Sequence, residues 1–213
     1  MGHMRDAGTG GAVLAEGFLA GTRIATGCGW SAVEALRPGD GVQTFEAGVQ
    51  PLVTVHAARF APVEVPEVLW SVFVPRDALD NRDDLLLLPQ QHILIEAECA
   101  EDMYGDRFAL VPAAALDGWR GIRRRRPRAG AEVLHLSFDA PQIVYASRAT
   151  LVACPGRAPR WHASTMRQPE PDGRARYAAL SLSQAEHLVA CLMAEDLGAA
   201  LWGRSVAGPR RWF

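Results

Sequence analysis

The chain has 213 residues, of which 49% are hydrophobic and 22% charged, and its formal net charge is −2. This balance is typical of a folded globular protein and excludes wholesale disorder and a collagen-like fibre. So small a net charge creates no global attraction to nucleic acid, and no apolar run approaches the roughly 20 residues that a membrane span requires.

The N-terminal residues 1–12 are polar and rich in glycine, so we predict a flexible leader. Met1-Gly2-His3-Met4 is typical of a cloning remnant. No apolar signal-peptide region follows, and the basic side chains are all arginine, as in many GC-rich bacterial sequences. We expect a protein of the bacterial cytoplasm, or one secreted by a route that needs no signal peptide.

The pattern over residues 13–156 is one of short apolar runs separated by turn residues, which predicts an all-β domain. Short helical turns are predicted at Ser31–Leu36 and Pro112–Ala115. The predicted strands are Arg23–Ala25, Gly41–Phe45, Leu52–His56, Val68–Val74, Leu85–Leu88, His92–Glu96, Val133–Phe138 and Ile143–Ala146.

The C-terminal extension, residues 157–213, begins with a polar stretch rich in arginine and proline. One helix is predicted at about 183–202, because apolar residues recur there at helical spacing. Ser183 and Glu186 have the spacing of a capping box, and Gly203 is a plausible stop. We expect this helix to pack on the β domain.

The four cysteines, Cys28, Cys99, Cys154 and Cys191, are isolated in the sequence, and no two form a Cys-x-x-Cys pair. We therefore predict free thiols, no metal site and no cofactor, and we place Cys99 in a loop and Cys191 on a helix face. The run Arg123–Arg126 is interpreted as a solvated strand edge rather than as a phosphate-binding patch.

Motifs of the common hydrolases, nucleotide-binding enzymes and zinc proteases are absent from the sequence. Instead, Gly17-Phe18-Leu19-Ala20-Gly21-Thr22 is followed by Val33-Glu34-Ala35-Leu36-Arg37-Pro38-Gly39-Asp40. This pair of sequence motifs resembles the opening of Hint domains, the module shared by Hedgehog autoprocessing domains and inteins. It is most like a bacterial branch that begins with Cys-Phe-x-x-Gly-Thr. Asp84–Ile95 and Leu134–Ala146 are similar to later blocks of the same family.

The resemblance implies a horseshoe of short strands with internal pseudo-twofold symmetry. It also implies self-cleavage by an N-to-S acyl shift, as in protein splicing. In that reaction a cysteine at the start of the domain attacks the preceding carbonyl, and a histidine assists departure of the amide nitrogen. Cysteine suits the first role because it is intrinsically nucleophilic, and histidine suits the second because its pKa lies near neutral pH.

Carried over residue by residue, the nucleophile position falls on Gly17, which has no side chain. The hydroxyl position of the Ser/Thr-x-x-His motif falls on Pro89, and its histidine falls on His92. Asp139 is the aspartate of the closing block, and His135 lies where relatives often carry a histidine. We expect His135 to be buried and hydrogen-bonded, and His92 to be either a site residue or a core histidine.

Three hypotheses remain open at this point. The first is a degenerate autoprocessing domain, unable to cleave itself, that binds or presents a protein partner or a flanking polypeptide. The second is an active self-cleaving domain that uses a displaced nucleophile, Cys28, or whose natural cysteine at position 17 has been removed. The third is an unrelated β-sandwich binding module.

Overall fold

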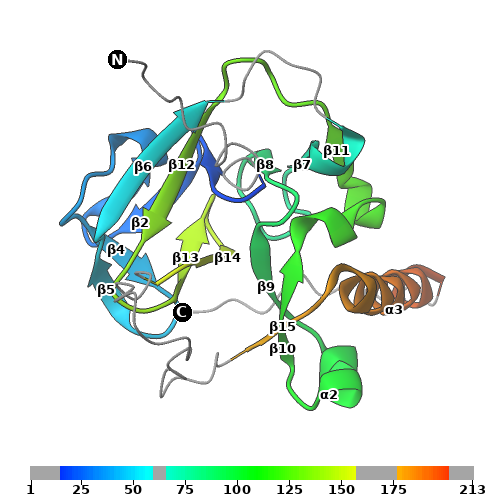
Figure 1. Ribbon diagram of the computed structural model, residues 1–213. Helices are drawn as coiled ribbons and strands as arrows, with labels where there is room; N and C mark the ends of the chain where they lie inside the picture. Colours follow the sequence, from blue (N-terminus) through cyan, green and yellow to red (C-terminus); the bar gives the residue numbers. More distant parts are fainter. Residues whose placement is uncertain (1–14, 60–65, 157–176, 202–213) are drawn as a thin grey trace, which may run out of the picture.

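The computed structural model describes residues 15–59, 66–156 and 177–201, and in these ranges the chain is mainly β (Figure 1). The described strands are β1 Phe18–Leu19, β2 Arg23–Thr26, β3 Gly29–Ala32, β4 Gly41–Thr44, β5 Gly48–Pro51, β6 Thr54–Arg59, β7 Ser71–Val74, β8 Leu85–Leu87, β9 His92–Glu96, β10 Phe108–Pro112, β11 Arg123–Arg125, β12 Glu132–Ser137, β13 Gln142–Ala146, β14 Thr150–Cys154 and β15 Ala178–Ala179.

Helical segments occupy the connections between the strands and the C-terminal part of the described chain. Two are α-helices, α2 Glu98–Tyr104 and α3 Leu182–Leu201. The others are 3₁₀ turns, η1 Val33–Ala35, η2 Glu67–Leu69, η3 Ala113–Leu116 and η4 Trp119–Gly121. The predicted all-β class with a C-terminal helix on the strands is therefore confirmed, while the internal pseudo-twofold axis stays a prediction.

The described strands form two sheets. One has six strands in the order β11-β7-β8-β1-β12-β6, and the other has nine, in the order β15-β10-β9-β14-β13-β2-β4-β5 with β3 paired to β2. β6 and β12 pair over six residues, from Glu132 opposite Arg59 to Ser137 opposite Thr54. β1 lies between β12 and β8, so the start of the domain is held inside the first sheet.

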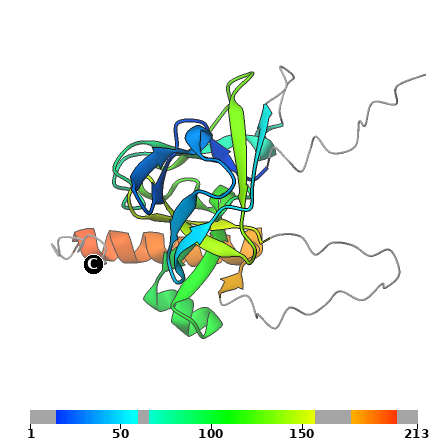
Figure 2. The same ribbon diagram turned by 90° about the vertical axis from the view of Figure 1, so that its left-hand side faces the viewer.

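Two large groups of buried side chains form the core. One joins β1, β2, β4, β12, β13 and β14 around fully buried residues such as Ile24 and Phe138. The other joins β7 to β10 with η3, α2 and α3 around Leu116 and Leu188. The strands of this second group lie on the same side of the molecule as both α-helices (Figure 1, Figure 2).

α3 packs against the β domain because its apolar residues follow the helical repeat. Ala185, Leu188, Val189 and Leu192 are buried in the second core. α3 is also held by polar contacts. Its Asp196 accepts hydrogen bonds from Trp119 Nε1 at 2.9 Å and from the Arg120 guanidinium at 2.8 and 2.9 Å. This ion pair and hydrogen bond hold the pKa of the Asp196 carboxyl below its usual range.

α3 begins one residue before the predicted position, and its capping serine differs from the prediction by two residues. Ser181, not Ser183, caps the helix: its backbone N–H and hydroxyl donate to Gln184 Oε1 at 3.0 and 2.8 Å. The Gln184 N–H in turn lies 3.4 Å from Ser181 Oγ. Both positions fit the capping-box spacing, and the choice between them depends on where Leu180 and Ala185 meet the core.

The predicted secondary structure also differs from the structure at two other places in the chain. Residues 98–104 form α2 rather than a loop, and Gly105 ends this helix with φ of 78°. Cys99, predicted to be a loop thiol, is therefore a buried helix residue. The predicted helical turn Ser31–Leu36 begins instead as the end of β3, because Ser31 and Ala32 pair with Ile24 and Arg23.

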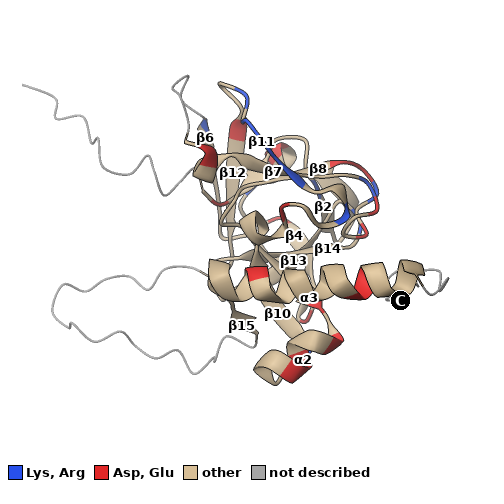
Figure 3. Ribbon diagram, turned by 90° about the vertical axis from the view of Figure 1, so that its right-hand side faces the viewer, with Lys and Arg blue, Asp and Glu red and all other residues tan. Residues whose placement is uncertain are grey.

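The arginine run forms β11 at the edge of the first sheet, where Figure 3 shows it as a blue segment. Arg123 and Arg125 lie over the ring of Phe73, with their guanidinium carbons 5.2 and 5.5 Å from its centroid. Arg124 forms an ion pair with Asp117 at 3.4 Å. Charged side chains on an edge strand hinder its pairing with another chain.

Candidate functional site

Gly17 lies immediately before β1, and its surroundings leave no room for a side chain. Its φ is +114°, in the region that L-amino acids rarely adopt. A Cβ added there would lie 2.8 Å from Val133 Cγ1, 3.1 Å from His135 Cε1 and 3.1 Å from the Leu134 carbonyl oxygen. The backbone at this position is therefore compatible with glycine alone.

The amide of Gly17 is held by Gln91, a residue 74 positions away in the sequence. The Gly17 N–H donates to Gln91 Oε1 at 2.8 Å, and Gln91 Nε2 donates to the Ala153 carbonyl at 2.6 Å. The Gln91 side chain is buried, so both ends of its carboxamide are fixed. The peptide bond between Glu16 and Gly17 thus faces a neutral amide oxygen.

A second hydrogen bond holds the chain on the other side of this peptide bond. The Gln90 backbone N–H donates to the Ala15 carbonyl at 2.9 Å, and Ala15 is buried. Two consecutive glutamines therefore fix the chain at Ala15 and at Gly17. The segment Ala15–Gly17 is clamped before it enters β1.

His135 completes the immediate surroundings of Gly17. It belongs to β12 and is in phase with Val133, so both side chains lie on the face of β12 that meets Gly17. His56 on β6 is directly opposite His135, with ring centroids 6.4 Å apart. His135 is half-buried and His56 is exposed, so this pair lies between Gly17 and solvent.

The other residues suggested by the family pattern lie elsewhere. His92 is the first residue of β9 and is in phase with Leu94, which packs with Tyr177 on the face opposite to Ile93. Asp139 is exposed and lies beyond the end of β12, four residues after His135. Neither is among the three atoms nearest to the position of a Cβ at Gly17.

Cys28 lies in the turn between β2 and β3 and is exposed. Its backbone N–H donates to Thr26 Oγ1 at 3.2 Å, which fixes the turn. The atoms nearest to the position of a Cβ at Gly17 come from β12 rather than from this turn. The structure therefore brings Gly17 together with Gln91 and His135, and it does not bring Cys28 to them.

The chemistry open to this arrangement is limited by its atoms. An acyl shift at Gly17 requires a nucleophilic side chain on that residue, and glycine has none. Departure of the amide nitrogen requires a proton donor, whereas Gln91 Oε1 is an acceptor only. The group of side chains around Gly17 can hold a peptide bond, but it has no nucleophile, and its histidine, His135, approaches the position of a Cβ rather than the amide hydrogen, which Gln91 binds.

Removal of the Gln91 carboxamide should destabilise the protein, because the buried Gly17 N–H would lose its acceptor. We expect Gln91→Ala to lower the free energy of unfolding by about 1–3 kcal/mol. Gln90→Ala, at the exposed neighbouring glutamine, is the matched control and should change stability by less than about 0.5 kcal/mol. Urea unfolding of both variants measures the difference, and equal effects would show that the clamp contributes nothing.

A cavity of about 350 Å³ lies apart from this site. Its lining includes Asp80, Arg120 and Glu195 but none of Gly17, Gln91 and His135. Burial raises the pKa of the Asp80 carboxyl. The cavity is therefore not where an acyl shift at Gly17 would take place.

Sequence reasoning missed Gln91 as the partner of Gly17 and His56 as the partner of His135. The pattern pointed to the next residue, His92, because histidine is the expected proton donor. Only the tight turn before β9, in which the Gln91 N–H donates to the Leu88 carbonyl, directs the Gln91 side chain to Gly17. His56 gave no local signal, since its relation to His135 depends on the register of β6 and β12.

Comparison with known proteins gives one family match. The family model described as Hint domain matches residues 16–151. No curated protein matches the chain. Within the described residues, no helix is long and apolar enough to cross a lipid bilayer.

Three solved structures are similar to the chain at low sequence identity. The solution structure of a bacterial intein-like domain from Clostridium thermocellum is 15% identical, with a TM-score of 0.46 over 64% of this chain and 97% of that one. A splice-inactive variant of the AceL NrdHF class 3 split intein is 13% identical, with a TM-score of 0.45 over 67% and 99%. The MchDnaB-1 intein is 14% identical, with a TM-score of 0.39 over 64% and 98%.

Proposed function

The chain belongs to the Hint domain family, and from this premise we propose that it is a member without self-cleavage that binds and presents the polypeptide preceding its first strand. The proposal rests on the surroundings of the peptide bond between Glu16 and Gly17. At this bond the family pattern requires a thiol, and the structure has a glycine in a conformation unfavourable to any side chain.

The first support is the missing attacking group. In an N-to-S shift, a cysteine sulfur attacks the carbonyl carbon of the preceding residue, and a thioester forms as the C–N bond breaks. Gly17 offers only hydrogen at that point. Even an ideally placed general acid, worth about 10²–10⁴-fold, does not replace the missing nucleophile.

The second support is the replacement of the proton donor. Gln91 Oε1 accepts the hydrogen bond of the Gly17 amide and has no proton to give to a departing nitrogen. The His92 side chain lies on the same face of β9 as Leu94, which packs against Tyr177. Among the described residues, His135 is the histidine that contacts the position where a Cβ at Gly17 would be, whereas Gln91 binds the amide hydrogen.

The third support is that the domain holds the chain on both sides of the peptide bond between Glu16 and Gly17. The Gln90 N–H and the Gln91 side chain hold Ala15 and Gly17 from the same turn. A polypeptide preceding Gly17 therefore enters the domain through a junction that is hydrogen-bonded at Ala15 and at Gly17. A scaffold that holds such a junction without cutting it would keep the preceding polypeptide attached at a fixed point.

The test is the intact mass of the purified protein after incubation with dithiothreitol or hydroxylamine, either of which resolves a thioester. We expect a single species at 23.1 kDa, because no thioester can form at Gly17. Release of a fragment ending at Glu16 would overturn the proposal.

The variant Cys28→Ser separates the two autoprocessing hypotheses. If the unmodified chain released the fragment and Cys28→Ser did not, the displaced-nucleophile hypothesis would be correct. If both released it, the attack would come from elsewhere in the chain. Stability of both proteins to both reagents supports a domain that has lost the reaction.

A further inference from the structure

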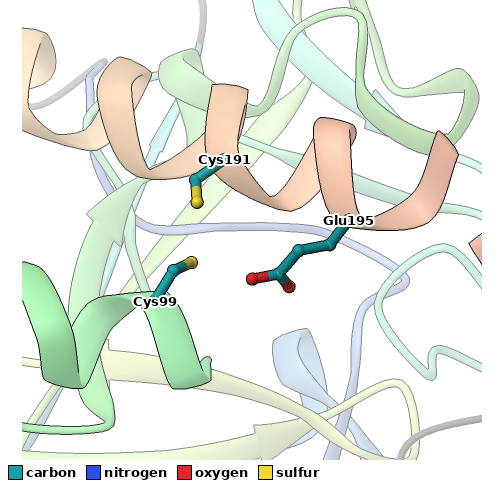
Figure 4. A group of neighbouring side chains, drawn as sticks. All are labelled: Cys99, Cys191 and Glu195. Carbon is teal, nitrogen blue, oxygen red and sulfur yellow. The ribbon is translucent and has the colours of Figure 1, made fainter. Parts of the chain in front are cut away.

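Two cysteines and a glutamate come together where α2 meets α3, away from Gly17. Cys99 comes from α2, and Cys191 and Glu195 come from α3 (Figure 4). Their Sγ and carboxylate oxygen atoms all lie within 4.8 Å of one another. In Figure 4 the two sulfur atoms point toward each other and the carboxylate points into the same space.

The helix geometry explains why these three donors converge. Cys191 and Glu195 are four residues apart, so they lie on one face of α3 one turn from each other. Cys99 lies opposite them because Cys99 and Ala100 bury the inner face of α2 in the same core as α3. No local spacing of ligand residues indicated a metal site, since Cys99 and Cys191 are 92 positions apart.

We propose that Cys99, Cys191 and Glu195 form a binding site for a divalent ion of the zinc class. Two thiolates and one carboxylate are a donor set that suits zinc, and three protein ligands leave a fourth position for water. With bonds of about 2.0–2.3 Å, ligand atoms on one tetrahedral ion are about 3.5–3.8 Å apart. Since the observed separations are at most 4.8 Å, they need to shorten by about 1.3 Å at most.

The surroundings of the site are compatible with a bound ion. Cys99 is buried, Cys191 is half-buried, and Glu195 is exposed and also lines the 350 Å³ cavity. Arg107, a cationic side chain of the cavity lining, forms ion pairs with Glu98 at 3.2 Å and with Glu101 at 3.5 Å.

The site also differs from that of a reactive cysteine. Burial raises the pKa of the Cys99 thiol, so an ion that binds there must displace the thiol proton. A bound ion would join α2 to α3 and so stabilise the folded state. The inference is independent of what happens at Gly17.

The experiment is a cobalt titration of the reduced, chelator-treated protein, followed by displacement with zinc. We expect a thiolate-to-cobalt charge-transfer band that saturates at one equivalent and disappears when zinc is added. Cys191→Ser and Cys99→Ser should each abolish the band, and Glu195→Gln should weaken cobalt affinity at least tenfold. Cys28→Ser, which removes an exposed thiol elsewhere, is the matched control and should keep the band.

Circular dichroism of each variant identifies a loss that is due to unfolding, and Cys191, which is only half-buried, gives the more tolerant substitution. Absence of the band in the folded unmodified protein would overturn the proposal. So would a band that survives Cys191→Ser or depends on Cys28. A disulfide between Cys99 and Cys191 in the air-exposed protein, with no cobalt band after reduction, would assign these thiols to redox chemistry instead and also overturn it.

Discussion

Replacing Gly17 by alanine should lower the free energy of unfolding by about 2–4 kcal/mol, although only one methyl group is added. Two causes act together. The φ of +114° is unfavourable to any L side chain, and the new Cβ would lie 2.8 Å from Val133 Cγ1, which is fully buried and has no free space to move into.

The control is Gly198→Ala on α3, where an added Cβ meets nothing within 4 Å. There, alanine should stabilise the protein by about 0.5–1 kcal/mol, because glycine in a helix carries a larger loss of backbone entropy. Urea unfolding of both variants gives effects of opposite sign if Gly17 is required by its surroundings. A loss below about 0.5 kcal/mol for Gly17→Ala would contradict the argument.

The double variant Gly17→Ala/Val133→Ala separates the two causes. Removing Val133 Cγ1 relieves the closest contact but leaves the φ unchanged. We expect the two single effects to be non-additive, with the second cost smaller than in the unmodified background. The result bears on function, because cysteine has the same Cβ: a thiol at position 17 would meet the same obstruction.

Replacing Leu188 by alanine should lower the free energy of unfolding by about 2–5 kcal/mol, since a fully buried side chain would leave a cavity between α3 and the β domain. Leu188 is 0% exposed and packs in the core that also contains Leu116 and Ile93. The family match ends at residue 151, so this loss would show that α3 is part of the same cooperative unit.

Leu197→Ala on the same helix is the control, because Leu197 is 64% exposed. It should change stability by less than about 0.5 kcal/mol. Thermal unfolding followed by near- and far-ultraviolet circular dichroism should give a single transition in both variants. A loss below about 1 kcal/mol for Leu188→Ala, or a separate transition for the helix, would show that α3 is an independent appendage.

The proposed metal site lies at the contact between α3 and the rest of the domain, the same contact that Leu188→Ala would weaken. Cys191 lies one residue before Leu192, whose side chain is buried in the core, so an ion at Cys191 would reinforce the same contact between α3 and the domain. The junction at Gly17 and the proposed ion site share no residue. An experiment that overturns one proposal therefore leaves the other unaffected.

Local sequence was enough to predict the features that depend on neighbouring residues. Strands such as His92–Glu96 were predicted at their observed bounds, because alternation and turn residues are local signals. The helix near the C-terminus was placed within one or two residues for the same reason. The cap residue was wrong because Ser181 and Ser183 both satisfy a local rule that only packing can decide.

The sequence by itself determined the mainly β class, the position of the C-terminal helix and the glycine where the family pattern has a thiol. Only the tertiary structure decided which side chain meets that glycine: it is Gln91, not His92, because a turn and a strand give consecutive residues different directions. The convergence of Cys99 with Cys191 and Glu195 was decided there too. Contacts between residues 74 or 92 positions apart depend on how distant strands and helices pack, and no local pattern of residues encodes that distance.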